Sequence, residues 1–247
     1  MNLPSEYIWD YQICTYDVGP NSQLRLSNLL RLQQEAGERH LAEGQLAYQN
    51  LAKMGMAFLV VRANLQIERL PRIGEKVKVC TWHRGEQGAA FYRCFQILSE
   101  QGEKLVDSVT AYALVDPGTK RLLRPKVFLQ LGIQSQEDKT GDCPDPERLK
   151  LPENLESAGV WKVRISDTDW NHHLNNAAYL DILWDFLPEG VEIENLGLIT
   201  VCFLSQALPG DEISVFRSIE NGEELYMRGV HSRGPCFEIK VKLKSHS

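Results

Sequence analysis

Residues 166–176 read Ser-Asp-Thr-Asp-Trp-Asn-His-His-Leu-Asn-Asn, and residues 177–187 continue Ala-Ala-Tyr-Leu-Asp-Ile-Leu-Trp-Asp-Phe-Leu. Either Asn175 or Asn176 can cap the first turn of a helix. Apolar residues recur at three- and four-residue steps after the cap, and Pro188 then stops the helix. The stretch therefore predicts a polar loop that leads into a helix with one apolar face.

Three polar side chains alternate in the loop: Asp169, Asn171 and His173. In an extended loop alternate side chains point the same way, so these three are expected to face one pocket. A carboxylate, an amide and an imidazole can together perform acid–base chemistry and bind a carbonyl group. Taken alone, such a pattern is more typical of a capped turn. The neighbouring His172 points away in an extended loop, and we expect no metal site because no second pair of ligands lies nearby in the sequence.

The order of predicted elements is repeated along the chain. The first half contains a strand, a long helix and four strands, predicted at residues 11–16, 22–44, 56–69, 76–83, 90–99 and 104–115. The second half repeats a strand, the loop and helix, and four strands, with the strands at residues 160–165, 193–205, 212–219, 224–232 and 236–244. Residues 124–157 are rich in Pro, Gln, Asp and Glu and predict a surface connector. The predicted domains are therefore 1–123 and 158–247, with 124–157 between them.

The two halves can be aligned without gaps around the loop. Asp17 aligns with Asp167, Asn21 with Asn171, Leu24 with Leu174, and Gly74-Glu75 with Gly210-Asp211. Internal duplication is the simplest explanation. Where the second half has Asp169 and His173, the first half has Gly19 and Gln23. Only the second half can therefore carry acid–base chemistry at this position.

The pattern Asp-x-Asn-x-His-x-Asn-Asn before an apolar helix resembles the signature of the acyl-acyl-carrier-protein thioesterases of plants and bacteria. Further segments resemble that family in order and spacing, at residues 56–75, 80–83, 115–122 and 203–211. The resemblance implies an α+β tandem (double) hot-dog fold. In this fold each half is an antiparallel sheet wrapped around a central helix, and we expect the two sheets to join edge to edge.

The resemblance also implies hydrolysis of fatty acyl-acyl-carrier-protein thioesters to free fatty acid by activated water, without metal or another cofactor. By position, Asp169 orients and polarises the network, Asn171 binds the thioester carbonyl and His173 assists as a base or hydrogen-bond partner. The sequence departs from the family pattern because Gln206 stands where a Glu is expected. A Gln can position water but cannot take its proton, which leaves Asp169 or His173 as the base.

A covalent thiol mechanism is not favoured, because the position after Gln206, which is Cys in some relatives, is Ala207. Cys202 is a minor alternative nucleophile, since strand parity would place it on the same face as Gln206; its default interpretation is core packing.

Two further groups of residues are predicted to meet the substrate. Bulky side chains of the first half are expected to close the acyl tunnel: Leu26, Leu30, Met54 and Phe58. A small basic cluster is expected to contact an acidic acyl carrier protein: Lys120, Arg121 and Arg124. Pairing of two copies into a homodimer is a further expectation from the resemblance.

Composition limits the class of protein. A net charge of −6 argues against nonspecific binding to nucleic acid or to an anionic membrane. The six cysteines are scattered, with no Cys-x-x-Cys spacing, and are predicted to be reduced, mostly buried thiols of a cytosolic protein. The first residues show no signal core, basic transit character or membrane-length apolar run. We therefore expect a cytoplasmic bacterial enzyme, or a mature form that has lost a leader.

Three alternatives remain open at this stage. An acyl-coenzyme A thioesterase would share the chemistry but not the carrier. A non-catalytic acyl-binding module is less remote because of Gln206, and a hot-dog hydratase would act on enoyl thioesters without releasing thiol. The preferred acyl chain length depends on packing depth and is not predicted.

Overall fold

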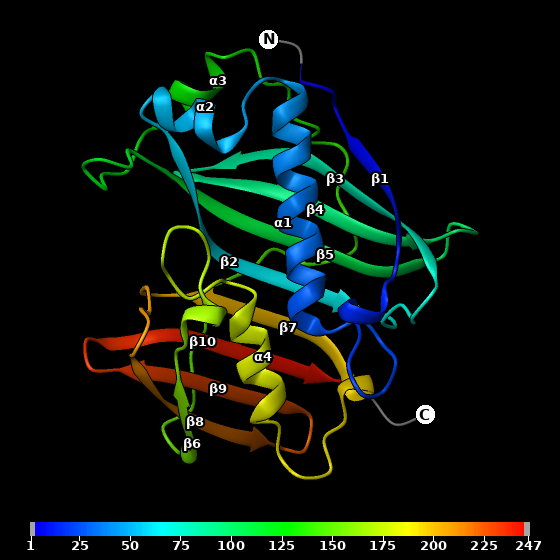
Figure 1. Ribbon diagram of the computed structural model, residues 1–247, viewed down its shortest axis with the longest axis vertical. Coiled ribbons are helices and arrows are strands. Elements are labelled where there is room, and N and C mark those ends of the chain that lie inside the picture. The colour runs from blue at the N-terminus through cyan, green and yellow to red at the C-terminus, as the bar shows by residue number, and fades with distance from the viewer. Residues whose placement is uncertain (1–2, 245–247) are drawn as a thin grey trace.

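The computed structural model describes residues 3–244, which form one antiparallel sheet of ten strands (Figure 1). The order of strands across the sheet is β1-β3-β4-β5-β2-β7-β10-β9-β8-β6. The first half supplies β1 (Tyr7–Gln12), β2 (Ala57–Ile67), β3 (Lys76–Gln87), β4 (Ala90–Ser99) and β5 (Lys104–Val115). The second half supplies β6 (Glu156–Lys162), β7 (Leu196–Phe203), β8 (Glu212–Glu220), β9 (Glu224–His231) and β10 (Gly234–Leu243).

The two halves join at one pair of central strands. Strand β2 runs antiparallel to β7, with Arg62 opposite Cys202 and Gln66 opposite Leu198. Counted outward from this junction, the strand order is β2-β5-β4-β3-β1 in the first half and β7-β10-β9-β8-β6 in the second. Equivalent strands of the two halves therefore occupy equivalent positions in the sheet. The prediction that two sheets join edge to edge is confirmed.

Helices α1 (Leu26–Glu43) and α4 (Ala178–Asp185) lie on the same face of the sheet (Figure 1). Leu26, Leu29 and Ala36 of α1 are fully buried, and so are Leu180 and Leu183 of α4. Their spacing places them on one side of each helix, as the sequence predicts. They belong to one core cluster that continues across both halves.

The opposite face of the first-half sheet is covered by the connector. Trp82 Nε1 donates a hydrogen bond to the Lys139 carbonyl (2.7 Å), and Asn64 Nδ2 donates one to the Pro144 carbonyl (2.9 Å). The buried carboxylate of Asp107 accepts the Asp142 amide at 2.6 Å. Residues 139–144 are therefore bound to the sheet by hydrogen bonds.

The duplication extends to individual backbone hydrogen bonds. Three bonds of the first half have equivalents in the second half with almost equal lengths: Gly19 N to Gln23 O (2.9 Å) and Asp169 N to His173 O (2.8 Å); Leu24 N to Pro71 O and Leu174 N to Ala207 O (both 2.8 Å); Gly74 N to Ile13 O (2.8 Å) and Gly210 N to Val163 O (2.9 Å). The alignment of the two halves made from the sequence therefore also holds in three dimensions.

Some element boundaries differ from the sequence predictions. The first strand ends at Gln12, not Tyr16, because the Asp17 carboxylate accepts the Cys14 amide (2.8 Å) and closes a 3-10 turn at Thr15–Asp17. The short helices α2 (Tyr48–Lys53) and α3 (Lys126–Leu129) were not predicted. Each is too short to show a clear helical repeat.

Two smaller predictions concern the cysteines and membrane segments. All six cysteines are free thiols, and five of them are buried, with Cys14 half-buried, which confirms the predicted burial. Among residues 3–244, no helix combines the length and apolar character needed to cross a membrane.

Candidate functional site

The loop at residues 168–174 is a closed turn. The Asp169 amide donates to the His173 carbonyl (2.8 Å), and the His172 amide donates back to the Asp169 carbonyl (3.0 Å). His172 has a φ of 62°, in the left-handed region that reverses the chain. The expectation of an extended loop with side chains on one face is therefore wrong, because a non-glycine residue adopts a positive φ that its type does not signal.

The Asp169 carboxylate is held inside this turn. Its Oδ1 accepts the amide hydrogens of Asn171 (2.8 Å) and His173 (3.3 Å). Asn171 is exposed, and Asp169 and His173 are half-buried. Beyond the turn, Asn175 Oδ1 accepts the Ala177 amide at 2.8 Å, one residue before α4 begins. The three predicted residues therefore lie in one small turn, with the carboxylate direction fixed by two backbone amides.

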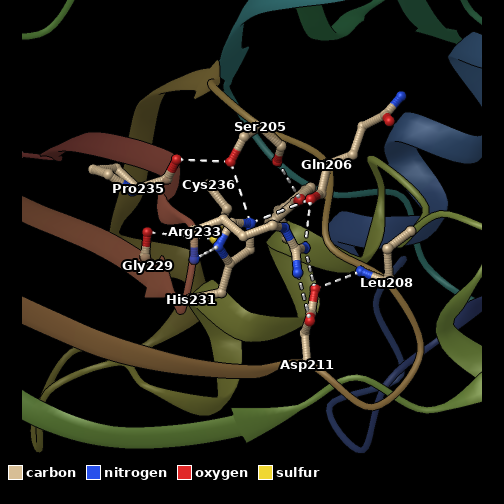
Figure 2. Close-up of polar contacts among 10 residues, drawn as sticks. Ser205, Gln206, Leu208, Asp211, Gly229, His231, Arg233, Pro235 and Cys236 are labelled. Atoms are coloured by element: carbon tan, nitrogen blue, oxygen red, sulfur yellow. Dashed lines mark hydrogen bonds and ion pairs between the residues drawn. The ribbon is translucent and has the colours of Figure 1, made fainter.

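Gln206 lies beside this turn, on the loop after β7. The Leu174 amide donates to the carbonyl of Ala207 (2.8 Å), which joins the turn to the segment that carries Gln206. The side chain of Gln206 is exposed, and Figure 2 shows it directed away from the polar cluster beneath it. Gln206 is thus next to the motif turn in space, and its amide is free to meet a ligand.

The backbone of Gln206 is fixed from below by His231 and Arg233 (Figure 2). Both side chains approach its carbonyl at 3.2 Å, through His231 Nε2 and Arg233 Nη2. The Arg233 amide donates to His231 Nδ1 (3.1 Å), so the ring carries its hydrogen on Nε2. His231 Nε2 also lies 3.2 Å from Ser205 Oγ, which donates to the Pro235 carbonyl. With Nε2 protonated, His231 cannot accept the Ser205 proton, and the cluster therefore positions the loop without forming a serine–histidine nucleophile.

An ion pair completes the support of this loop. Arg233 contacts both carboxylate oxygens of Asp211, at 3.0 and 2.5 Å, and Asp211 also accepts the Leu208 amide at 2.7 Å. The Arg233 guanidinium lowers the pKa of the Asp211 carboxyl, and the hydrogen bond from the Leu208 backbone amide lowers it further. The loop between β7 and β8 is therefore fastened at both ends.

A cavity of about 160 Å³ opens in the first half, between the C-terminal part of α1, the sheet, α2 and α3. Its apolar wall consists of Leu3, Leu41, Leu51, Phe58, Val60, Phe91, Phe128 and Ile133. Its polar groups are Gln34, Glu38, Tyr48, His83, Arg93 and Tyr112. The cavity is thus mostly apolar with a few convergent polar groups, as is typical of ligand sites.

The residues predicted to close an acyl tunnel are placed differently from one another. Phe58 lines the cavity, and Leu30 borders a narrower hollow that shares Gln34 with it. Leu26 is fully buried at the N-terminal end of α1, away from the part of this helix that lines the cavity. Met54 follows α2 and is 38% exposed. The expectation for Leu26 and Met54 is therefore corrected: neither lines the cavity.

The motif turn meets the cavity through Tyr48. This side chain lines the cavity, its hydroxyl donates to Asn171 Oδ1 at 3.5 Å, and its ring packs edge-on against Trp170 with 4.2 Å between centroids. Asn176 borders the narrower hollow together with Gln34. The second half therefore brings its polar turn to the edge of a cavity that the first half builds.

Several cavity residues were missed from the sequence. Arg93 gave a usable signal, because it is the one charged residue in the run Phe91-Tyr92-Arg93-Cys94-Phe95. A charge inside an apolar strand is costly unless it has a purpose. Tyr48 and Glu38 gave none, since the contact between α2 and the motif turn depends on packing.

Cys202 is unsuited to nucleophilic attack. It is 4% exposed, and its thiol contacts the carbonyl of Glu147 in the connector at 3.6 Å. Burial raises the pKa of the Cys202 thiol and so disfavours the thiolate. The parity argument that linked Cys202 to Gln206 fails because β7 ends at Phe203, and the interpretation as a core residue is favoured.

The predicted basic cluster lies just before one wall of the cavity in the chain. Lys120, Arg121 and Arg124 are exposed, and they directly precede α3 (Lys126–Leu129) in the chain. Phe128 of α3 lines the cavity. An acidic partner bound at the cluster would therefore be close to the cavity wall.

Comparison with known proteins identifies two matching domains. The model of the acyl-ACP thioesterase N-terminal domain matches residues 4–126, and that of the acyl-ACP thioesterase C-terminal domain matches residues 152–233. An Arabidopsis thaliana protein, oleoyl-acyl carrier protein thioesterase 1, is 23% identical over 227 residues, which are 82% of this chain and 61% of that protein. The dodecanoyl-[acyl-carrier-protein] hydrolase of Cinnamomum camphora is 21% identical, covering 86% of this chain and 59% of that protein. This chain therefore spans less than two thirds of the length of these curated relatives.

Solved structures share the fold over almost the whole chain. An acyl-ACP thioesterase from Bacteroides thetaiotaomicron matches with a TM-score of 0.86 at 18% identity, covering 97% of this chain and 98% of that one. The 12:0-ACP thioesterase from Umbellularia californica matches with a TM-score of 0.79 at 18% identity, covering 98% of each chain. These similarities confirm the predicted tandem hot-dog fold.

Proposed function

The chain belongs to the acyl-ACP thioesterase family, and from this premise we propose that it hydrolyses fatty acyl-acyl-carrier-protein thioesters to free fatty acid and holo-carrier protein. One observation carries the proposal: Tyr48 lines the apolar cavity and also contacts Asn171 and Trp170 of the motif turn. An acyl chain in the cavity would therefore leave its thioester beside the polar turn.

In the proposed reaction a water molecule attacks the thioester carbonyl carbon. The exposed amide of Asn171 binds the carbonyl oxygen, which gains negative charge as the tetrahedral intermediate forms. Asp169, whose direction is fixed by the Asn171 and His173 amides, orients the network. Asp169 or His173 takes the proton of the attacking water, and the thiolate of the carrier leaves without needing a metal.

Gln206 is proposed to position the attacking water. Its side chain amide can donate to and accept from water, but it cannot remove a proton at neutral pH. His231 and Arg233 both contact the backbone carbonyl of Gln206 and hold it in place. The side chain amide of Gln206 therefore extends from a fixed point of the loop. The base must then come from the motif turn. This turn is joined to the segment that carries Gln206 by the hydrogen bond from the Leu174 amide to the Ala207 carbonyl.

We propose that the carrier protein approaches over Lys120, Arg121 and Arg124. These exposed cations precede α3, one wall of the cavity, while the protein as a whole carries a net charge of −6. A local positive cluster on an acidic protein favours a defined approach of an acidic partner. Location in the cytoplasm and pairing of two copies stay predictions from the sequence.

Two other functions are separated from this one by experiment. The replacement of the expected Glu by Gln206 favours, as the second candidate, an acyl-binding protein that does not hydrolyse its ligand. An acyl-coenzyme A thioesterase would release the same acid from a different carrier.

The decisive assay measures free thiol and identifies the released acid from one acyl chain attached to carrier protein and to coenzyme A. We expect faster release from the carrier protein, and strong loss in Asn171→Ala. Asn21→Ala, at the first-half position equivalent to Asn171, is the matched control and should retain activity. Binding of acyl carrier protein without thiol release would contradict the proposed hydrolysis.

A further inference from the structure

Arg93 of β4 is a buried cation without a counter-ion. Its side chain lines the cavity, and the residue is 8% exposed. The guanidinium donates from Nη1 to His40 Nδ1 (2.9 Å) and to Thr81 Oγ1 (3.2 Å), both neutral acceptors. Within residues 3–244, no carboxylate lies within 4 Å of it, although Glu38 lines the same cavity. A buried guanidinium without an anionic partner is costly, so the fold retains it at the expense of stability.

Next to Arg93, His83 has a ring nitrogen without a hydrogen-bond partner. The two residues are directly opposite each other on β3 and β4, and both line the cavity. His83 is 5% exposed, and its Nε2 has no hydrogen-bond partner. The nearest acid, Glu86, is 3.7 Å from this nitrogen, which is beyond hydrogen-bond distance. Two adjacent buried side chains thus line the cavity among the described residues, one a cation without a carboxylate partner and the other an imidazole with an unpartnered nitrogen.

The charges of the neighbouring imidazoles are set by burial. Burial, and then the charge of Arg93, lowers the pKa of His40 to about 4 and that of His83 to about 4. His40 also donates from Nε2 to the Pro4 carbonyl at 2.7 Å. Both rings are therefore neutral at pH 7, and the positive charge at this end of the cavity belongs to Arg93.

The rest of the cavity suits a short carbon chain. Phe58, Phe91 and Phe128 contact one another edge-on, with centroids 4.9 to 5.6 Å apart. A volume of about 160 Å³ is close to that of an engineered apolar cavity of roughly 150 Å³ that holds benzene. The space therefore accommodates a group of roughly six carbon atoms. The half-buried residues Glu38 and Tyr48 lie on the side of the motif turn, and the buried Arg93 and His83 lie deeper.

A plain alkyl chain does not match the deep end of this cavity. Its methyl end would displace water from the guanidinium and return no hydrogen bond. A carboxylate at the same place would pair with Arg93 and accept from His83 once this ring presents a hydrogen on Nε2. We propose that the cavity takes acyl chains that end in a carboxylate, so that the substrates are monothioesters of dicarboxylic acids. This assignment specifies the acyl group of the proposed hydrolysis. It rests on that proposed function only in taking the other end of the chain to be a thioester.

Binding can be measured separately from turnover with pantetheine amides, in which nitrogen replaces the thioester sulfur. Hexanoyl, octanoyl and decanoyl amides are each compared with the amide of the same length that ends in a carboxylate. By calorimetry, we expect at least about tenfold tighter binding of one carboxylate-ended chain than of its plain counterpart, as a charged hydrogen bond provides. Equal affinities, tighter binding of the plain chains, or no binding of any amide would overturn the proposal.

Variants then assign the preference to the guanidinium. Arg93→Met, confirmed as folded by circular dichroism, should remove the preference for the carboxylate-ended chain, and Arg93→Lys should retain part of it. The matched control is Arg84→Met, because Arg84 lies on the neighbouring strand β3 among buried residues but pairs with Asp145 of the connector on the other face. The control should keep the preference, and a preference that survives in Arg93→Met would overturn the assignment.

The same pairs of acyl chains, attached to the carrier protein as thioesters, distinguish failure of the proposed hydrolysis from failure of the proposed chain preference. Selective binding of the carboxylate-ended amides without thiol release from any thioester would refute hydrolysis and leave the inference intact. Thiol release with equal rates for plain and carboxylate-ended chains would support hydrolysis and refute the inference.

Discussion

The two halves of this protein have the same backbone fold and differ in the side chains that this fold carries. The turn at Gly19–Gln23 and the turn at Asp169–His173 have the same hydrogen bonds, and Ser22 and His172 have φ angles of 61° and 62°. The first turn carries no acid or imidazole, and its half has the longer helix and the cavity. The second turn carries both groups on a half whose helix has 8 residues. The comparison teaches that the cavity and the acid–imidazole pair lie on different copies of one fold.

Substitution of His173 should distinguish the two halves most strongly. His173→Ala removes the imidazole, and we expect kcat to fall about 10²- to 10⁴-fold, the usual range for a general acid or base. Gln23→Ala changes the equivalent residue of the first half and should leave kcat within a factor of about three, since no proton transfer is assigned there. Steady-state thiol release measures both. Comparable losses in the two variants would show that the halves are not specialised.

Acid should weaken the first half before the second. His40 and His83 have pKa values lowered to about 4, mainly by burial. Well above pH 6.5 these residues are neutral in both folded and unfolded chains. As the pH falls below 6.5, the unfolded chain binds protons that the folded chain refuses until about pH 4, so stability falls within this window. At pH 5 the expected loss is about 2 kcal/mol for each residue.

Urea unfolding at pH 7 and pH 5 measures this loss, and hydrogen exchange locates it. Protection should decrease first in β3 and β4, which carry His83 and Arg93. A free energy of unfolding that does not change between these pH values would contradict the prediction.

At Gly19 the first half lacks room for the side chain that the second half has at the equivalent position, Asp169. A Cβ added at Gly19 would lie 2.4 Å from Cη2 of Trp184, a contact that requires a shift. Gly19→Ala should therefore cost about 1–3 kcal/mol, as overpacking does. Trp184→Leu makes room, so the cost of Gly19→Ala should shrink in that background. Equal costs in both backgrounds, measured by urea unfolding, would rule out the clash as the cause.

A smaller gain is expected from Gln206→Glu. A carboxylate at this position could accept the proton of the water that Gln206 is proposed to position, and kcat should rise about tenfold. Gln206→Met keeps the length of the side chain without its hydrogen bonds and should lower kcat. A fall in kcat for the Glu variant would show that the motif turn works better without a second acid beside it.

The repeated fold could be predicted from sequence, because the spacing of leucines in α1 and the turn residues between strands are local signals. The motif residues could be located for the same reason. Their geometry could not, since the positive φ of His172 depends on hydrogen bonds closed by the whole turn. Leu26 and Met54 were misplaced because depth along a helix or beyond its end depends on packing. Arg93 gave a signal as a charge inside an apolar strand, but its place in the cavity depends on packing.

The pairing of β2 with β7 inside one polypeptide has a genetic consequence. In a module built from two identical chains, every mutation is present twice, and a change that improves one site alters the other as well. Here the codon for residue 19 is separate from that for residue 169, so glycine and aspartate can each be selected where they fit. Covalent fusion also keeps the halves together at any dilution, so dilution alone cannot separate the cavity from the motif turn.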